Sequence, residues 1–230
     1  MMLKRWSLLA GLLCVALLSW WAGCSNPNLA GGKLHFDQAG RLADPAERAA
    51  RYERARDTFI QAMRELPQSG EARLWLGKTY AELGQTDSAA KYFDLAVQLE
   101  PVLKTDAQNA RDHYWSVMTN LGQASAKGAQ EAKTAGDEAR ADSLYHQALS
   151  ELRKSMVYSP LKHQSYNLSG IVYFNLEQPD SAIPMFRKSY ELSRNADEVG
   201  ERGKVEKQFL GILERQGDRA YQSGENLKAS

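Results

Sequence analysis

The chain is poor in cysteine, and this excludes a disulfide framework. Cys14 and Cys24 are the only two cysteines among 230 residues. Cys14 lies within an apolar run from Trp6 to Gly23, and Cys24 follows that run directly. A domain formed by the rest of the chain therefore has to be held together by apolar packing alone.

The sequence also lacks the patterns typical of enzymes, metal sites and nucleic-acid binders. Its 29 basic and 28 acidic residues nearly cancel, and there is no basic face for nucleic acid. Neither a Gly-rich phosphate loop nor a Gly-x-Ser-x-Gly elbow is present. The histidines are scattered, without Asp, Glu or Cys at metal-ligand spacing; they are His35, His113, His146 and His163. We therefore expect no catalytic residues, no cofactor, no metal and no nucleic-acid partner.

The N-terminus has the pattern of an export signal. Lys4 and Arg5 precede the apolar run, and small residues follow it at Ala22-Gly23-Cys24. A secretory signal has this order of charge, apolar stretch and small-residue site. The Ala-Gly-Cys ending resembles the bacterial lipobox. That resemblance implies a signal peptide at 1–23 and a lipid on Cys24, which becomes the first residue of the mature protein.

The same segment allows a second mode of membrane attachment. The apolar run of about 18 residues is just long enough to span a bilayer as an uncleaved signal anchor. Trp21 also departs from the lipobox, where leucine is usual. Either attachment places the rest of the chain outside the cytoplasm, because the positive residues precede the run. By resemblance to lipoproteins of two-membrane bacteria, Ser25 lacks the aspartate of inner-membrane retention. This favours a lipid anchor in the outer membrane facing the periplasm over an inner-membrane signal anchor.

The remainder of the chain is helical in composition. Residues 24–31 carry Asn, Gly and Pro and predict a lipidated tether. Beyond them Ala, Leu, Glu, Arg, Lys and Gln dominate, and no alternating strand pattern is longer than a few residues. We therefore expect residues 32–230 to be all-α.

A set of small and large apolar residues recurs at fixed distances before a proline. Pro67 and Pro101 are 34 residues apart. The recurring sets are Ala55, Phe59, Ala62; Ala89, Phe93, Ala96; Ala148, Leu152, Ser155 before Pro160; and Ala182, Phe186, Ser189, with Arg194 in the place of proline. Spacings of four and three put each set on one helical face. Small residues on that face let two helices approach closely, and the large apolar residue is expected to fill the gap between them in the core.

A preceding helix shows the same phase. Gly77 and Tyr80 stand before Ala89 at the offsets that Gly170 and Tyr173 have before Ala182. The combined pattern resembles the tetratricopeptide repeat, a 34-residue helix-turn-helix unit. The resemblance implies a right-handed superhelical solenoid of antiparallel helix pairs, with about four repeats and a C-terminal capping or partial repeat. The expected units are about 32–67, 70–101, 105–160, 163–194 and, in part, 197–230.

Two units are irregular. The first has a loop around 43–45 and a lengthened second helix. In the third, Pro101 and Pro160 are 59 residues apart, 25 more than one period. We place this surplus within 123–140 and expect two over-long helices, roughly 105–131 and 137–158, because good helix formers continue across it. A longer hairpin is the simpler interpretation, and a projecting element that contacts a partner is the alternative.

A solenoid of this kind has a concave surface lined by the first helix of each unit. Side chains not needed for packing would face it and bind a protein or peptide segment; these are Glu71, Leu74, Lys78, Glu82, Asn167, Ile171, Phe174 and Asn175. Family members that clamp a peptide carboxylate use Lys and Asn at two particular groove places. Those places hold Leu74 with Lys78, and Asn167 with Ile171, so we do not expect that clamp.

These patterns predict a function in binding. We expect a membrane-anchored scaffold or adaptor of the bacterial cell envelope, attached through the lipid on Cys24. The alternative is an N-terminal interaction module of a longer envelope protein, with any catalytic part beyond residue 230. The incomplete repeat at 197–230 motivates that alternative.

Overall fold

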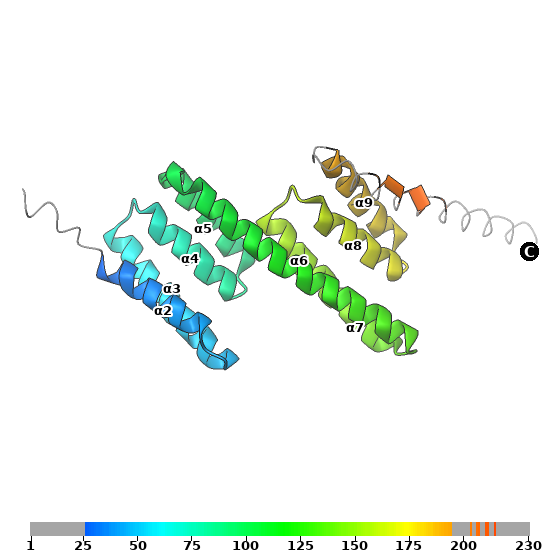
Figure 1. The fold of residues 1–230 in the computed structure, drawn as a ribbon, viewed down its shortest axis with the longest axis horizontal. Helices are drawn as coiled ribbons and strands as arrows, with labels where there is room; N and C mark the ends of the chain where they lie inside the picture. The colour runs from blue at the N-terminus through cyan, green and yellow to red at the C-terminus, as the bar shows by residue number, and fades with distance from the viewer. Residues whose placement is uncertain (1–25, 195–202, 204–205, 208–209, 212–213, 215–230) are drawn as a thin grey trace, which may run out of the picture.

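In the computed structural model the chain forms a row of antiparallel α-helix pairs (Figure 1). The structure describes residues 26–194 and, beyond them, only residues 203, 206–207, 210–211 and 214. The helices are α2 (Pro27–Gly40), α3 (Pro45–Glu65), α4 (Gly70–Glu82), α5 (Thr86–Leu99), the short 3-10 helix η1 (Pro101–Leu103), α6 (Lys104–Thr134), α7 (Glu138–Tyr158), α8 (His163–Asn175) and α9 (Pro179–Ser193). Residues 26–194 contain no strand. The fold is all-α, as the composition predicts.

Each pair is a hairpin of consecutive helices. Helix α2 packs mainly on α3, α4 on α5, α6 on α7, and α8 on α9, and successive pairs touch through α3 and α4 and through α7 and α8. The turns within the pairs lie along one edge of the array (Figure 1). The turns between pairs lie along the opposite edge, together with the N-terminal end of α2. The architecture is a helical-hairpin solenoid.

The recurring small and aromatic positions form the core, as the sequence predicts. Phe59, Phe93 and Phe186 have no exposed surface. A Cβ added at Gly77 would lie 2.8 Å from ring carbons of Phe93, and one added at Gly170 would lie 2.8 Å from ring carbons of Phe186. Glycine is required at these crossings because any side chain would displace a closely packed ring.

The same glycine contact shows where the surplus residues of the third pair lie. A Cβ at Gly122 would lie 2.8 Å from Leu152 Cγ, so Gly122 is the counterpart of Gly77. It follows Pro101 by 21 residues, whereas the equivalent distance in the second pair is 10, so 11 surplus residues lengthen the start of α6. The remaining 14 of the 25 follow Gly122. The prediction that all of them fall within 123–140 is therefore wrong.

Both inserted lengths preserve the helical faces. Eleven residues make about three turns, and the other 14 add seven residues, about two turns, to each helix of the hairpin. The two expected long helices are confirmed as α6 and α7. Ala129, Ala132 and Ala141 are buried where the added turns meet, and the Tyr145 hydroxyl donates to Gln130 Oε1 at 3.2 Å. The added hairpin turns are packed helix rather than loop.

The expected tether is wrong for residues 27–31, which belong to α2. Pro27 stands in the first turn, where its missing N–H has no helical partner to lose. Asn26 Oδ1 caps the helix by accepting a backbone N–H three residues on. The side-chain amides of Asn26 and Asn28 donate to Glu65 at the end of α3, at 2.7 and 2.8 Å, and lower the pKa of its carboxyl. The first pair thus begins at 27 rather than 32, because Asn and Pro here start a helix.

One further expectation is confirmed, and two concern residues outside the described part of the chain. The expected loop around 43–45 and the lengthened second helix are present as the turn before α3 and as the 21 residues of α3 itself. The signal peptide at 1–23 and Cys24 lie outside the described residues, as does most of the partial repeat at 197–230. Among the helices that the structure describes, none has the length and apolar character to cross a bilayer.

Candidate functional site

A groove of about 450 Å³ lies between the first helices of the first three pairs. Its lining residues are Phe36 from α2, Trp75, Lys78 and Glu82 from α4, and Asp106, Asn109, Ala110, His113 and Tyr114 from α6. Only first helices contribute to it. The groove therefore lies on the surface where a helix-pair solenoid holds its partners.

Trp75 is a fixed aromatic wall of this groove. Its ring meets the edge of Phe36 at a centroid distance of 5.4 Å and stacks on the buried Phe59 at 6.3 Å. The ammonium groups of Lys33 and Lys78 lie 5.5 and 4.5 Å from its ring centroid. A half-buried indole held from several sides presents a large apolar surface at little cost in conformational entropy.

The two lysines beside Trp75 differ in their partners. Lys33 forms an ion pair with Glu71 at 2.6 Å. Burial lowers the pKa of Lys78, an effect that Asp106 opposes. Within residues 26–194 no carboxylate oxygen comes within ion-pair distance of the Lys78 ammonium. Lys78 is therefore a half-buried cation without a direct ion pair, and such a cation attracts an anionic group from a ligand.

Glu82 lines the groove and interacts with two tyrosines, Tyr52 and Tyr114. The Tyr114 hydroxyl donates to Glu82 Oε1 at 2.9 Å. Burial, and then the charge of Glu82, raise the pKa of Tyr52 to about 12, and the same two causes raise the pKa of Tyr114. Both hydroxyls therefore stay protonated at neutral pH, and the hydrogen bond from Tyr114 holds the carboxylate in place.

The groove offers binding surfaces rather than reactive groups. His113 is exposed and packs edge-on against Tyr114 at 5.0 Å. In the described part of the chain, no three His, Cys, Asp or Glu side chains gather closely enough to hold a metal ion. What the arrangement can do is stack, accept and donate hydrogen bonds, and neutralise a charge.

The structure separates the predicted groove residues of α4. Lys78 and Glu82 line the groove, and Glu71 lies beside it in its ion pair with Lys33. Leu74 is a wrong prediction, because only 4% of its surface is exposed. It shares a core cluster with Ala107 of α6. That alanine belongs to the turns that the surplus residues add to the start of α6, so these turns cover a position that an ordinary repeat leaves open.

The predicted residues of α8 do not reach this groove; they are Asn167, Ile171, Phe174 and Asn175. Ile171 and Phe174 pack against the buried Phe186 of α9. The side-chain oxygen of Asn167 is buried, and the Asn175 carbonyl accepts a hydrogen bond from Lys133 at 3.4 Å. This set occupies a separate part of the first-helix surface.

The groove residues that the sequence did not reveal come mostly from α6. Asp106, Asn109 and His113 lie in its added first turns, which have no counterpart in a 34-residue unit. Trp75 departs from the pattern, since an aromatic residue is usual two places earlier, where Arg73 stands. That displaced aromatic was the signal in the sequence for the position of Trp75.

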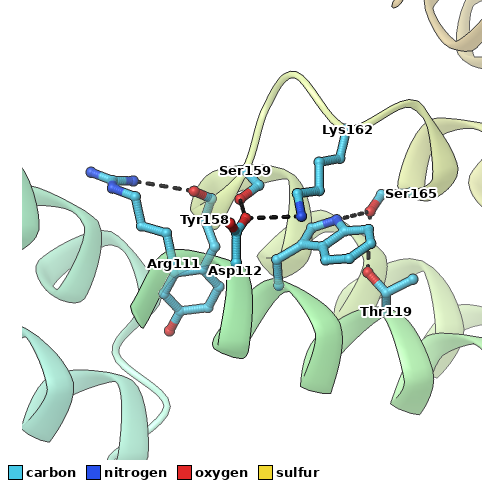
Figure 2. Close-up of polar contacts among 8 residues, drawn as sticks. Arg111, Asp112, Thr119, Tyr158, Ser159, Lys162 and Ser165 are labelled. Atoms are coloured by element: carbon cyan, nitrogen blue, oxygen red, sulfur yellow. Dashed lines mark hydrogen bonds and ion pairs between the residues drawn. The ribbon is translucent and has the colours of Figure 1, made fainter. Parts of the chain in front are cut away.

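A polar cluster fixes the turn between α7 and α8 against α6 (Figure 2). Asp112 Oδ1 accepts from Lys162 Nζ at 2.9 Å and from the Ser159 hydroxyl at 3.4 Å. Arg111 donates to the Tyr158 carbonyl at 3.2 Å. The ammonium of Lys162 also lies 4.1 Å from the centroid of a tryptophan ring on α6. These contacts hold the turn in one position.

A buried cluster of hydroxyl groups extends the contact between α6 and the start of α8 (Figure 2). Ser165 Oγ accepts a hydrogen bond from Trp115 Nε1 at 2.9 Å, and it lies 2.7 Å from Ser155 Oγ and 3.3 Å from Thr119 Oγ1. The three hydroxyls are buried at the meeting of α6, α7 and α8. The network satisfies their polar atoms and couples the third pair to the fourth.

Comparison with known proteins identifies the repeats. Residues 46–121 and residues 163–195 each match a family model described as "Tetratricopeptide repeat". No curated protein matches the chain. Solved structures similar to it include the TPR protein TTC0263 of Thermus thermophilus, with 20% identity over 85% of this chain and 98% of that chain and a TM-score of 0.32. Another is MamA from Desulfovibrio magneticus, with 18% identity over 73% of this chain and 97% of that chain and a TM-score of 0.25. A third is yeast Tom70, with 14% identity over 85% of this chain and 50% of that chain and a TM-score of 0.30.

Similarities this low in identity and TM-score bear on neither the function nor the partner of the chain. The family models rest on the sequence itself, and their two segments contain the recurring positions of the second and fourth helix pairs. The chain therefore contains tetratricopeptide repeats, identified in residues 46–121 and 163–195.

Proposed function

We propose that the chain is a lipid-anchored scaffold of the bacterial cell envelope, whose groove between α2, α4 and α6 binds a segment of a partner protein. Tetratricopeptide repeats generally bind proteins or peptides. The observation that carries the proposal is the pairing of a fixed indole, Trp75, with a half-buried, unpaired cation, Lys78, in a groove lined only by first helices.

The groove fits a peptide that has an apolar side chain next to an acidic one. An apolar or aromatic side chain would stack on Trp75, and indoles in such positions dominate the affinity of many interfaces. The acidic group would pair with Lys78, whose partial desolvation strengthens that attraction. Asn109, which is exposed at the rim, would donate to or accept from the peptide backbone.

The proposed groove predicts position-specific contact with a partner. A photo-crosslinking amino acid at Asn109 should react with a partner segment in intact cells. The same amino acid at Gln98, exposed on α5 outside the groove, should not. Lys78→Met keeps the stem that packs on Trp75 and removes the charge, so it should reduce the crosslink from position 109 several-fold. Lys91→Met, at an exposed site on α5, should leave it unchanged. A crosslink of equal yield from both positions, or one insensitive to Lys78→Met, would contradict the proposal.

The anchoring proposal rests on the order of charge, apolar run and Ala-Gly-Cys at residues 4–24. It predicts that the protein isolated from native membranes begins at an acylated Cys24. Mass spectrometry of the intact protein measures this directly. A mass that includes Met1 would overturn the lipid anchor and leave the uncleaved signal anchor in its place.

A further inference from the structure

We infer that the edge formed by the turns between helix pairs rests on the lipid bilayer, with Val102 and Leu161 inserted at the headgroup boundary. This inference rests on the proposed lipid anchor at Cys24. It goes beyond that anchor because it gives the anchored domain a single orientation.

The connection between Cys24 and the described fold is short. Only Ser25 separates Cys24 from Asn26, the N-cap of α2. Two residues span at most about 7 Å when fully extended. Asn26 and Asn28 are bonded to Glu65, so this end of α2 is held to the body of the fold. The part of the domain around Asn26 therefore lies within about 7 Å of the acylated residue.

Asn26 lies on the same side of the fold as the turns between helix pairs. In Figure 1 the N-terminal end of α2 shares one edge with the turns that lead into α4, α6 and α8. The turns within the pairs lie on the opposite edge, a helix length away. A bilayer that holds residue 24 thus faces the edge made by residues 66–69, 100–103 and 159–162. We call this the anchor edge.

The anchor edge exposes two large apolar side chains. Val102 is 84% exposed and Leu161 is 79% exposed, the two highest values among the large hydrophobic residues that the structure describes. Each directly follows the proline that closes a helix pair. Single exposed apolar side chains are common, but these two occupy equivalent positions after the closing proline, on the edge that carries the N-terminal end of α2 (Figure 1).

Their neighbours hold both side chains outward. Leu103 packs against the core cluster below η1, so the preceding Val102 points away from it. Lys162 is fixed by Asp112, as Figure 2 shows, and the Tyr166 hydroxyl donates to the Pro160 carbonyl at 3.1 Å. A turn whose backbone is already held in position loses little backbone entropy when its apolar side chain enters a membrane interface.

In this orientation the long hairpin of α6 and α7 points away from the membrane. Its added turns lie at the junction of α6 and α7, on the edge opposite the anchor (Figure 1). Seven added residues lengthen each helix by about 10 Å. The hairpin tip would then reach about 10 Å farther from the membrane than the turn between α8 and α9, into the space where soluble partners diffuse.

The test uses the full chain purified from membranes and reconstituted into vesicles of phosphatidylethanolamine and phosphatidylglycerol. Val102→Cys, Leu161→Cys and, as the matched control on the opposite edge, Ala135→Cys each add an exposed thiol for a fluorophore. Quenching by lipids that carry a nitroxide near the headgroup should be several-fold stronger at 102 and 161 than at 135. The parent protein gives the background from its own cysteines, and circular dichroism confirms that each variant is folded.

The outcomes separate this inference from the anchor itself. Equal quenching at the three positions in a protein whose mass shows acylated Cys24 would overturn the orientation and leave the anchor standing. Stronger quenching at 102 and 161 in a protein that retains Met1 would overturn the lipid and support the edge, because Asn26 is then equally close to a membrane-spanning run. Equal quenching together with an intact Met1 would overturn both.

Discussion

Replacing Phe93 with alanine should lower the free energy of unfolding by about 3–5 kcal/mol, the range for removing a buried phenylalanine side chain. Phe93 has no exposed surface and lies against Gly77 and within the core cluster that also contains Tyr114 and Tyr158. The loss should be large because the ring fills the crossing of α4 and α5 and also contacts the next pair. The glycine cannot move in to fill the space, since it has no side chain.

Urea unfolding followed by circular dichroism measures this change. The matched control is Leu161→Ala, which removes an apolar side chain that is 79% exposed and should change the free energy of unfolding by less than about 0.5 kcal/mol. Comparable losses from the two substitutions would mean that the repeat register is wrong. If Phe93→Ala lowered the slope of the free energy of unfolding against urea concentration, the helix pairs would instead be unfolding separately, as in arrays with nearest-neighbour coupling only.

The repeat register was predictable because it depends on local geometry. Two small residues seven positions apart, with a large apolar residue between them on the same helical face and a proline after them, leave few alternatives to a tight helix crossing. The same argument predicted Phe59, Phe93 and Phe186 as core residues, and all three are completely buried. The long helices of the third pair followed from composition, since nothing between 105 and 131 breaks a helix.

The start of α2 was missed because its signal has two meanings. Asn and Pro in succession are typical of linkers, and they are equally typical of an N-cap followed by the first turn of a helix. What decides between them is the contact with Glu65, 37 and 39 residues away. No local pattern contains that contact.

The candidate groove was only half predictable for a related reason. Lys78 and Glu82 follow from the repeat register of α4, which is local. The opposite wall is supplied by the turns added at the start of α6, and placing the surplus after Gly122 put those turns in the wrong part of the sequence. The burial of Leu74 and the presence of Asn109 in the groove were both missed because of that single misplacement.

The division of the surplus residues can be tested with two glycines of α6. Gly122→Ala should destabilise the protein by about 1–3 kcal/mol, because the new methyl group overpacks a tight crossing. It would lie 2.8 Å from Leu152 Cγ and 3.3 Å from the carbonyl oxygen of Ala148. The carbonyl belongs to the backbone of α7, so the contact cannot be relieved by rotating a side chain.

Gly128→Ala in the same helix should have the opposite sign. A Cβ there meets only Leu144 Cδ1 at 3.5 Å, an ordinary contact. Alanine in a helix interior is more favourable than glycine by about 0.5–1 kcal/mol, so this substitution should stabilise the protein by about that amount. Thermal and urea unfolding of the two variants compares glycines six residues apart. If Gly122 is a true counterpart of Gly77, the two changes differ in sign. If the surplus lies entirely after it, Gly122 is not at a crossing, and both substitutions raise stability alike.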